Sequence, residues 1–476
     1  MERLTGQDAS FLYMETPSVH MHTLKVAIID LPTKIPYADV FDLVRVSMES
    51  KLHLVPRLRL RAVEVPGGLH HPVWVRDPNF NIGRHLYRAK IEEPGGAREM
   101  DQAIAEIASL QLPRDRPLWE TWLLEGLADG GVVLATKIHH SLADGIASAT
   151  MLAKVMSIDA DHDDLSAPNP PWVPEPIPSP RTLLKDAVRD QREQLGILGP
   201  LIKRTVHGSI NVLKNVKERE IDVPYPFRTP RTVFNRALSP RRSFASASLP
   251  LADFKAVKNA ANVTMNDVVL ATIAGALNRF FDERGEHLSR PLVASVPMAV
   301  ATPGNVPRTA GNRVANLFTS LCNDVTDPLL RLQRIHAVTS QSKQVQTQLG
   351  MDTLLDWSEA APAVLYRWIL RAYSFSRLSD YLPPPASLIV SNVRGPDHPL
   401  YVAGARLRAI YSVGPAIEGI GLNITGWSYC GELAFALIAD ADAVPDPHPI
   451  TDALPAALYE LKEATGVGSS SRGVSP

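Results

Sequence analysis

Two blocks of strand and helix patterns lie on either side of a proline-rich stretch. In the first block, the spacing of apolar positions predicts strands at 22–30, 57–65, 118–127 and 131–138, and helices at 37–54, 98–111 and 146–157. In the second block it predicts helices at 264–282, 328–346 and 361–374, and strands at 291–299, 314–321, 388–393, 406–413, 421–429 and 432–439. This order of elements predicts an α/β protein with two domains and mixed sheets, and it argues against a barrel or an all-helical protein.

The proline-rich stretch supplies the predicted domain boundary. Seven of the 40 prolines fall between Pro168 and Pro180, so this part is expected to be extended. One core rarely grows past ~250–300 residues, and a chain of 476 residues therefore indicates at least two domains. We predict an N-terminal domain over 1–165, a linker with crossover helices over 166–230, a C-terminal domain over 231–465 and a flexible tail over 466–476.

A basic segment follows the prolines. Residues 183–220 have a helical pattern that is interrupted near Gly199-Pro200, and the part over 201–217 carries four Lys/Arg and no acid. Two interpretations stay open for 201–217. It is either an amphipathic helix that lies on a membrane surface or a crossover helix whose apolar positions pack on a core.

Charge and cysteine content exclude several classes of protein. The 49 Lys+Arg residues balance 50 Asp+Glu residues, which argues against a general nucleic-acid binder. Two cysteines are too few for a disulfide scaffold or an iron–sulfur protein, so a reducing cytoplasmic setting is the default.

The N-terminus has no secretory-signal pattern, and the longest apolar run, 268–277, is shorter than the ~20 residues that span a bilayer. Any membrane association is therefore expected to be peripheral.

The motif His139-His140-Ser141-Leu142-Ala143-Asp144-Gly145 is the strongest candidate for chemistry. It follows the predicted strand at 131–138 and precedes the predicted helix at 146–157, a junction that holds side chains rigidly at a cleft. A histidine there can act as a general base near pH 7, because its ordinary pKa is ~6.5. Asp144 can fix the loop or the ring orientation, and Gly145 is expected to permit a backbone turn that other residues resist.

This HHxxxDG motif resembles the active-site motif of the CoA-dependent acyltransferases related to chloramphenicol acetyltransferase. That superfamily includes the condensation domains of peptide synthetases and the bacterial wax ester synthase/diacylglycerol acyltransferases. Five further segments narrow the resemblance to the last of these and span nearly the whole chain in the family's order. They are LTGQDASFLY at 4–13, PLWE at 117–120, TMND at 264–267, Gly311-Asn312 and SNVRGP at 391–396.

The resemblance implies a fold and roles for particular residues. It implies two chloramphenicol acetyltransferase-like domains with an active-site tunnel at their interface, entered by acyl-CoA and an alcohol from opposite ends. His140 would be the general base that takes the alcohol proton as the alcohol oxygen attacks the thioester, without an acyl-enzyme. Asn266 and Asn392 are candidate oxyanion donors by their motifs, and Trp119 is a candidate for lining the tunnel.

A structural role stays open for each of the other residues in this set. His139 and Asp144 can shape the loop, Trp119 can pack in a core, Asn266 can belong to a helix cap, and Asn392 can belong to a turn. The chain also departs from the family after the strand at 295–299. Relatives often carry an arginine there that can pair with the motif aspartate, whereas this chain has Val300-Ala301. The resemblance therefore does not name the partner of Asp144.

The predicted activity is the transfer of a long acyl chain from acyl-CoA to diacylglycerol or a fatty alcohol, at the inner membrane face or on lipid droplets. Two alternatives stay open. One is an acyltransferase for a polyketide-derived alcohol or a carrier-protein donor, and the other is a catalytically weak lipid-binding or lipid-droplet scaffold.

No metal or redox cofactor is expected. The histidine pairs 20/22, 70/71 and 139/140 lack an HExxH pattern, and the sequence has no Walker A or GxSxG motif. Cys430 has no support as a nucleophile.

Overall fold

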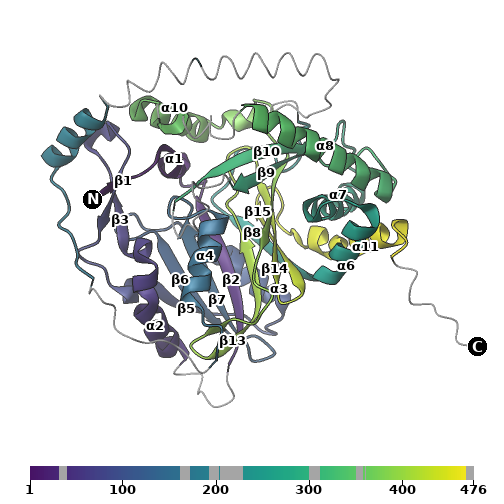
Figure 1. Cartoon of the computed structure of the whole chain (residues 1–476), viewed down its shortest axis with the longest axis horizontal. Helices are drawn as coiled ribbons and strands as arrows, with labels where there is room; N and C mark the ends of the chain where they lie inside the picture. Colours follow the sequence, from purple (N-terminus) through teal and green to yellow (C-terminus); the bar gives the residue numbers. More distant parts are fainter. Residues whose placement is uncertain are drawn as a thin grey trace, which may run out of the picture.

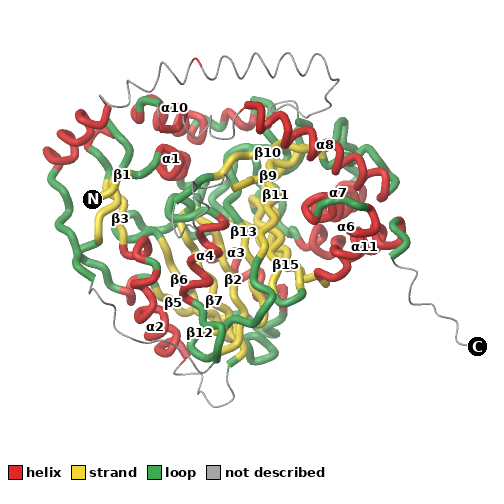
Figure 2. The backbone as a smooth tube through the Cα atoms, in the orientation of Figure 1, coloured by secondary structure: helices red, strands yellow, loops and turns green. Residues whose placement is uncertain are grey.

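Two six-stranded mixed sheets form the framework of the protein (Figure 1). We describe them from a computed structural model. It describes residues 1–31, 40–160, 172–191, 203, 229–299, 311–349, 357–359 and 361–467. Figure 2 shows the strands of both sheets in the centre of the molecule, with helices around them.

The first sheet has the strand order β12-β13-β2-β7-β6-β5. Its strands are β12 (Tyr401–Val402), β13 (Ala405–Val413), β2 (His22–Asp30), β7 (Val132–His139), β6 (Trp119–Glu125) and β5 (Leu86–Lys90). All neighbours are antiparallel except β5 and β6. β2 is buried along almost its whole length, because α3 (Ala97–Ala108) packs on one face of the sheet and α2 (Val40–Lys51) and α4 (Gly145–Val155) lie over the other.

The second sheet has the strand order β10-β9-β11-β14-β15-β8. Its strands are β10 (Val314–Ser320), β9 (Val293–Ala299), β11 (Leu388–Arg394), β14 (Leu422–Tyr429), β15 (Glu432–Asp440) and β8 (Arg242–Pro250). β11 runs parallel to β9 and β14, and the other pairs are antiparallel. The predicted α/β architecture with mixed sheets is therefore confirmed.

The longest apolar run of the sequence forms the central helix of the second core. α7 (Met265–Glu283) starts with a capping box between Thr264 and Asp267, and its residues 268–277 are buried. The helices α6 (Leu251–Ala261), α8 (Pro328–Leu349) and α11 (His448–Ala464) surround it. Among the described residues, no single helix is long and apolar enough to cross a membrane; α6 and α7 pass that test together, with a bend of 107° between them.

Strand β13 connects the two halves of the chain. It lies within the predicted C-terminal domain over 231–465, yet it pairs with β2 in the first sheet, and the next strand, β14, lies in the second sheet. Strand pairing therefore places β12 and β13 in the first sheet, and the predicted domain bounds stay a prediction. The hydrophobic pattern of this segment suits either sheet, because strands pair through their backbones at any distance along the chain.

Part of the predicted linker packs on the N-terminal domain. Trp172 stacks on the Arg59 guanidinium, and residues 180–191 form a helix with Leu183 and Ala187 in a small buried cluster. That cluster also contains residues of a three-stranded sheet made of β1 (Glu2–Arg3), β4 (Val73–Arg76) and β3 (Leu60–Val63). The basic segment at 201–217 lies outside the described residues apart from Lys203, so its two interpretations stay open.

The predicted strand at 57–65 is shorter than expected, because Pro56 opens a 3-10 helix that extends to Arg59. The apolar pattern did not predict β8, whose residues RSFASASLP are mostly small and polar, or α11, which contains Pro455. It missed α1 (Gly6–Met14) as well. The remaining elements are α10 (Ala363–Phe375) and the 3-10 helices η2 (Leu52–Leu54), η3 (Pro56–Arg59), η4 (Pro66–Gly68), η5 (Ile82–Arg84) and η7 (Leu378–Asp380).

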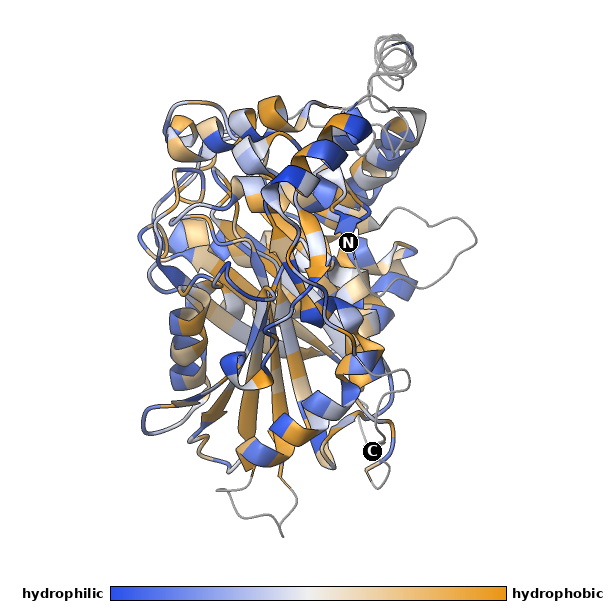
Figure 3. Cartoon of the chain, turned by 90° about the vertical axis from the view of Figure 1, so that its left-hand side faces the viewer, coloured by the Kyte–Doolittle hydropathy of each residue, from blue (hydrophilic) through white to orange (hydrophobic). Residues whose placement is uncertain are grey.

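Figure 3 colours the central strands largely as hydrophobic and shows hydrophilic residues mainly on the outer helices and loops. Two clusters of buried residues combine strands of both sheets. One joins Val26 and Ile104 to Phe244 and Ile438, and another joins Ala27 to Trp427. The two sheets therefore share packed contacts, and the loop that follows β7 lies where the two halves of the chain meet.

Candidate active site

The HHxxxDG motif forms the loop between β7 and α4. β7 ends at His139 and α4 begins at Gly145, so the predicted order of strand, loop and helix is confirmed. The Asp144 carboxylate caps the helix, since its Oδ1 accepts a hydrogen bond of 2.8 Å from the Ala147 backbone N–H. This cap fixes the start of α4 relative to the loop.

A segment of the second half closes the loop from the other side. The Gly311 N–H donates to the Leu142 carbonyl (2.9 Å), and the Asp144 N–H donates to the Gly311 carbonyl (3.3 Å). The second carboxylate oxygen of Asp144 accepts from the Arg313 backbone N–H at 3.1 Å. Two backbone amides, one from each half of the chain, therefore bind Asp144, whose partner the resemblance did not name.

Asn312 binds His140 and fixes which ring nitrogen carries the proton. Its Nδ2 donates to the His140 carbonyl and to Asp8 Oδ1, both at 2.7 Å, and both of those atoms are acceptors. Its Oδ1 therefore faces His140 Nδ1, at 3.0 Å. An amide oxygen only accepts hydrogen bonds, so Nδ1 is the protonated nitrogen and Nε2 holds the free lone pair.

Burial keeps the His140 imidazole neutral. It lowers the pKa of His140 to about 4, although Asp144 and Asn312 act in the opposite direction. The Phe11 ring stacks on the imidazole with 4.2 Å between centroids, so the ring has a fixed plane. Burial also raises the pKa of Asp8 to about 6, against the hydrogen bonds from Asn312 and Thr5. With a pKa of about 4, the His140 imidazole is neutral at pH 7, and Asn312 connects it to Asp8.

His139 has the opposite tautomer and a different neighbourhood. Its Nδ1 accepts from the Ser141 backbone N–H at 3.1 Å, which leaves Nε2 as the protonated nitrogen. That Nε2 lies 3.7 Å from Glu15 Oε1, and Arg114 pairs with the same carboxylate. Burial raises the pKa of Glu15, but His139 and Arg114 outweigh it and hold the pKa at about 2. This geometry favours a loop-shaping role for His139.

Gly145 does not act as expected. It is the first residue of α4 and does not have a positive φ, so its backbone conformation is open to other residues. A Cβ at this position would lie 3.7 Å from Val393 Cγ2, an ordinary contact distance. The prediction of a turn that requires glycine is therefore wrong, because the chain enters the helix directly through the Asp144 cap.

The candidate tunnel-lining residue and the two candidate oxyanion donors take no part in the hydrogen bonds of His140. Trp119 is buried, stacks on His85 and donates its Nε1–H to the Leu58 carbonyl at 2.7 Å, so it packs in the core while it also borders a cavity. Asn266 is partly exposed in the first turn of α7, where Thr264 and Asp267 make the cap. Asn392 lies on β11 beside Val393, the residue that faces Gly145.

The residue that binds His140 was therefore not predicted from the sequence. Asn312 belongs to the segment Gly311-Asn312 that carries the resemblance, which assigns it no role of its own. Asp8 and Phe11 belong to the N-terminal segment that carried the resemblance, and they had no assigned role. The contact between Asn312 and His140 spans 172 positions, which no local pattern reveals.

An apolar cavity of about 110 Å³ lies between the first sheet and the helices α2 and α4. Trp119, Leu134 and Ile138 border it from the sheet, and Met151 and Val155 border it from α4. Lys25 is a buried cation in this wall; its Nζ donates to Ser412 Oγ and lies 4.9 Å from the centre of the Trp427 ring. Burial lowers the pKa of Lys25 to about 8, and the charge of Asp144 opposes that shift.

The other histidine pairs contact carbonyls and neighbouring rings. His20 and His22 both contact the Ala108 carbonyl, and His71 Nδ1 lies 2.8 Å from the Tyr13 hydroxyl. His70 Nδ1 accepts from the His71 backbone N–H. Within the described ranges, no three His, Cys, Asp or Glu side chains gather as metal ligands would.

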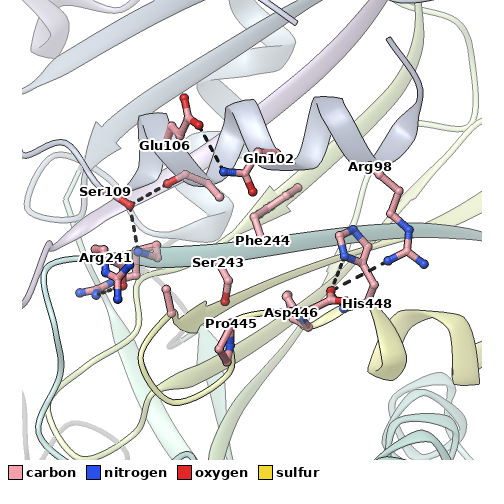
Figure 4. A pocket seen from close by; sticks show the side chains of 14 residues that line it. Arg98, Gln102, Glu106, Ser109, Arg241, Ser243, Phe244, Pro445, Asp446 and His448 are labelled. Carbon is pink, nitrogen blue, oxygen red and sulfur yellow. Dashed lines mark hydrogen bonds and ion pairs between the residues drawn. The ribbon is translucent and has the colours of Figure 1, made fainter. Parts of the chain in front are cut away.

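A larger pocket, of about 700 Å³, lies where α3 faces β8 and the start of α11 (Figure 4). His448 is held there between two carboxylates, with Nε2 3.1 Å from Asp101 and Nδ1 2.6 Å from Asp446. The hydrogen bond that His448 donates to the Asp101 carboxylate raises the pKa of His448 above its ordinary value. No residue of the HHxxxDG loop lines this pocket.

Known proteins match this chain over nearly its whole length. Residues 4–269 match the wax ester synthase/diacylglycerol acyltransferase catalytic domain, and residues 310–462 match the C-terminal domain of the same family. Two proteins of Mycobacterium tuberculosis strain H37Rv, each named as a candidate diacylglycerol O-acyltransferase, are 37% and 36% identical over 474 and 467 residues. The alignments cover 98% of this chain and 97% and 98% of those proteins.

Solved structures agree with these matches. The wax ester synthase/diacylglycerol acyltransferase of Marinobacter aquaeolei VT8 aligns with a TM-score of 0.68 at 26% identity, over 98% of this chain and 100% of that one. The first condensation domain of the calcium-dependent antibiotic synthetase aligns with a TM-score of 0.59 at 14% identity, over 98% and 97%, which shows a shared fold alone. The chain therefore belongs to the wax ester synthase/diacylglycerol acyltransferase family of acyltransferases.

Proposed function

We propose that this protein transfers a long acyl chain from acyl-CoA to the hydroxyl group of a lipid alcohol, with His140 as the general base. The observation that carries the proposal is the hydrogen bond between His140 Nδ1 and Asn312 Oδ1, which leaves Nε2 as the basic nitrogen. Burial, which lowers the pKa of His140 to about 4, keeps that nitrogen unprotonated at neutral pH. These two features are what a general base requires before the substrate binds.

The proposed reaction is a direct transfer. His140 Nε2 takes the hydroxyl proton as the alcohol oxygen attacks the thioester carbonyl carbon and forms the new C–O bond. The tetrahedral intermediate then collapses, the C–S bond breaks, and the CoA thiolate takes the proton back from the imidazolium. No metal or redox cofactor enters these steps. Asp8 and Asn312 hold the ring, and Asp144 holds the loop. Asn266 and Asn392 are kept as candidate oxyanion donors by their motifs alone.

The acceptor is proposed to be diacylglycerol or a fatty alcohol. The names of the Mycobacterium tuberculosis relatives support diacylglycerol, and the name of the Marinobacter enzyme supports both acceptors. The apolar cavity beside Ile138, two positions before His140, supports a site for part of a hydrocarbon chain. Such substrates partition into lipid, so we propose that the enzyme works at the inner membrane face or on lipid droplets, with the tunnel between the two halves of the chain.

The test is thiol release from palmitoyl-CoA, with and without diacylglycerol or hexadecanol. We expect alcohol-dependent release by the parent protein and a loss of about 10²- to 10⁴-fold in the His140→Ala variant. His398→Ala is the matched control, since His398 is exposed and outside the site. Full activity of His140→Ala would contradict the mechanism.

Two outcomes would redirect the proposal. Release only from a carrier-protein thioester, or only with a polyketide-derived alcohol, would favour the alternative transferase. A folded parent that binds lipid without any turnover would favour the lipid-binding scaffold. The absence of an arginine after Ala299 would support that scaffold if it left Asp144 without a partner and the loop loosely held. The structure weakens this support, because Asp144 is already bound by the amides of Ala147 and Arg313.

A further inference from the structure

Helix α10 presents an apolar face to solvent. Five large apolar side chains of this helix are at least 44% exposed, and Trp368 is the most exposed at 67%. The five are Val364, Leu365, Trp368, Ile369 and Phe375. Their spacing places them on one side of the helix, because residues three to four positions apart share a face. Leu378, Tyr381 and Leu382 continue the exposed apolar surface beyond the helix.

The opposite face of α10 is already packed. Tyr366 and Leu370 pack against the buried cluster that includes Leu12 and Tyr13 of α1, and the Tyr366 and Tyr13 rings meet edge to face at 6.2 Å. Figure 1 shows α10 beside α1 at the upper end of the molecule. The orientation of the helix is therefore fixed by its contacts, and the exposed face is not its packing face.

The charges of α10 favour an anionic partner. The helix carries Arg367 and Arg371 and no acidic residue, and Arg377 follows it. Arg367 and Arg377 form ion pairs with Glu64 and Asp380, whereas Arg371 is exposed at the edge of the apolar face. An apolar face with Trp and Tyr and an arginine at its edge is the composition of helices that lie in a lipid–water interface.

The same helix is connected to the candidate active site. α1, on which α10 packs, carries Phe11, which stacks on His140, and Asp8, which binds Asn312. A lipid surface at α10 would therefore lie on the far side of the helix that positions the base. α10 and α1 would then lie between His140 and the lipid surface, from which a lipid alcohol would come.

We propose that the exposed face of α10, extended by Leu378, Tyr381 and Leu382, docks on the surface of an anionic lipid layer. The inference rests on the proposed function for the identity of the acceptor as a lipid, but binding is measurable without turnover. The experiment is sedimentation of the full-length protein with vesicles of phosphatidylcholine, with and without phosphatidylglycerol, at low and high salt.

The α10 variant is Trp368→Ser combined with Ile369→Ser. We expect its partitioning onto vesicles to fall at least about tenfold, because even one large apolar side chain contributes that much when it is buried. The matched control is Leu330→Ser combined with Tyr459→Ser, two exposed residues of α8 and α11 that should leave partitioning unchanged. Arg371→Gln should weaken binding about fivefold, and only to vesicles with phosphatidylglycerol at low salt.

Three results would overturn the proposal. They are a parent protein that binds no vesicle, an α10 variant that binds as well as the parent, and a parent dimer in lipid-free buffer that this variant converts to monomer. The last result would make a second copy of the chain the occupant.

Turnover with a water-soluble alcohol separates this proposal from the proposed function. An α10 variant should keep that turnover, whereas a parent without any turnover would contradict the proposed function and leave vesicle binding as an independent result.

Discussion

Two histidines at contacts between the halves of the chain, His140 and His448, show how burial and charged partners lead to opposite protonation states. His140 faces the amide oxygen of Asn312, and burial keeps it neutral with a pKa of about 4. His448 contacts the carboxylates of Asp101 and Asp446, and they raise its pKa despite partial burial. The same side chain is therefore neutral at pH 7 in one region and favours the cation in the other. The predictions below change one partner at a time.

Among changes to the partners of the two histidines, the largest effect is expected from removal of the amide that orients His140. Asn312→Ala takes away the acceptor for Nδ1–H and the donors to Asp8 and to the His140 carbonyl. We expect a fall of about 100-fold in kcat for alcohol-dependent thiol release, because a catalytic group displaced by about 1 Å costs that much. Asn259→Ala, on an exposed position of α6, is the control and should keep the parent rate. A parental kcat for Asn312→Ala would show that Asn312 does not position the base.

A smaller, pH-dependent effect is expected at Asp8. Burial raises the pKa of Asp8 to about 6, whereas the pKa of His140 is lowered to about 4. Lowering the pH through 6 therefore protonates Asp8 first and disturbs Asn312 while His140 remains a base. At pH 5, one unit below the pKa of Asp8, kcat/KM of the parent should be about tenfold below its value at pH 7.

The Asp8→Asn side chain keeps an oxygen that can accept a hydrogen bond from Asn312, but its amide does not titrate between pH 4 and pH 8. The kcat/KM of this variant should therefore stay level down to the pKa of His140, near 4. The measurement is the pH profile of kcat/KM between pH 4 and pH 8 for both proteins. An acid limb near 6 that persists in Asp8→Asn would assign that limb to a group other than Asp8.

The smallest effect is expected at His448, and on stability rather than on catalysis. The raised pKa means that the folded state binds a proton more tightly than the unfolded state does. The stabilisation is therefore fully present below the ordinary histidine pKa of ~6.5 and is lost as the pH rises through the higher folded value. His448→Gln should lower the free energy of unfolding by about 1 kcal/mol at pH 6, and by less at pH 9.

Urea unfolding at the two pH values measures this difference, and kcat should not change. An equal loss of stability at pH 6 and pH 9 would indicate that His448 contributes by packing rather than by charge. A fall in kcat would instead connect the pocket of Figure 4 to catalysis.

The helices α7 and α10 show what an apolar pattern can and cannot predict. Both were predicted from their periodicity, and both are present. Residues 268–277 of α7 are buried between the second sheet and neighbouring helices, whereas α10 buries one face and exposes Trp368 on the other. Periodicity reports that an apolar face exists, but the number of surfaces available to cover it depends on the packing of the whole chain.

The sequence alone determined the local features of this protein. Apolar patterning predicted most strands of both sheets, because side chains along a strand alternate between its two faces, but it missed β5 and β8. The motif from His139 to Gly145 predicted the order of strand, loop and helix around His140, and a resemblance spread over the chain predicted the family. Each of these features depends on residues that are close together in the chain or on segments in a fixed order.

Only the tertiary structure decided which distant groups meet. It paired His140 with Asn312 across 172 positions and Asn312 with Asp8 across 304, and it placed β13 in the first sheet. It also gave Asp144 the Arg313 amide as a partner and removed the expected need for glycine at position 145. The physical reason is that hydrogen bonds and strand pairing depend on distance and direction in space, which the packing of the two halves fixes.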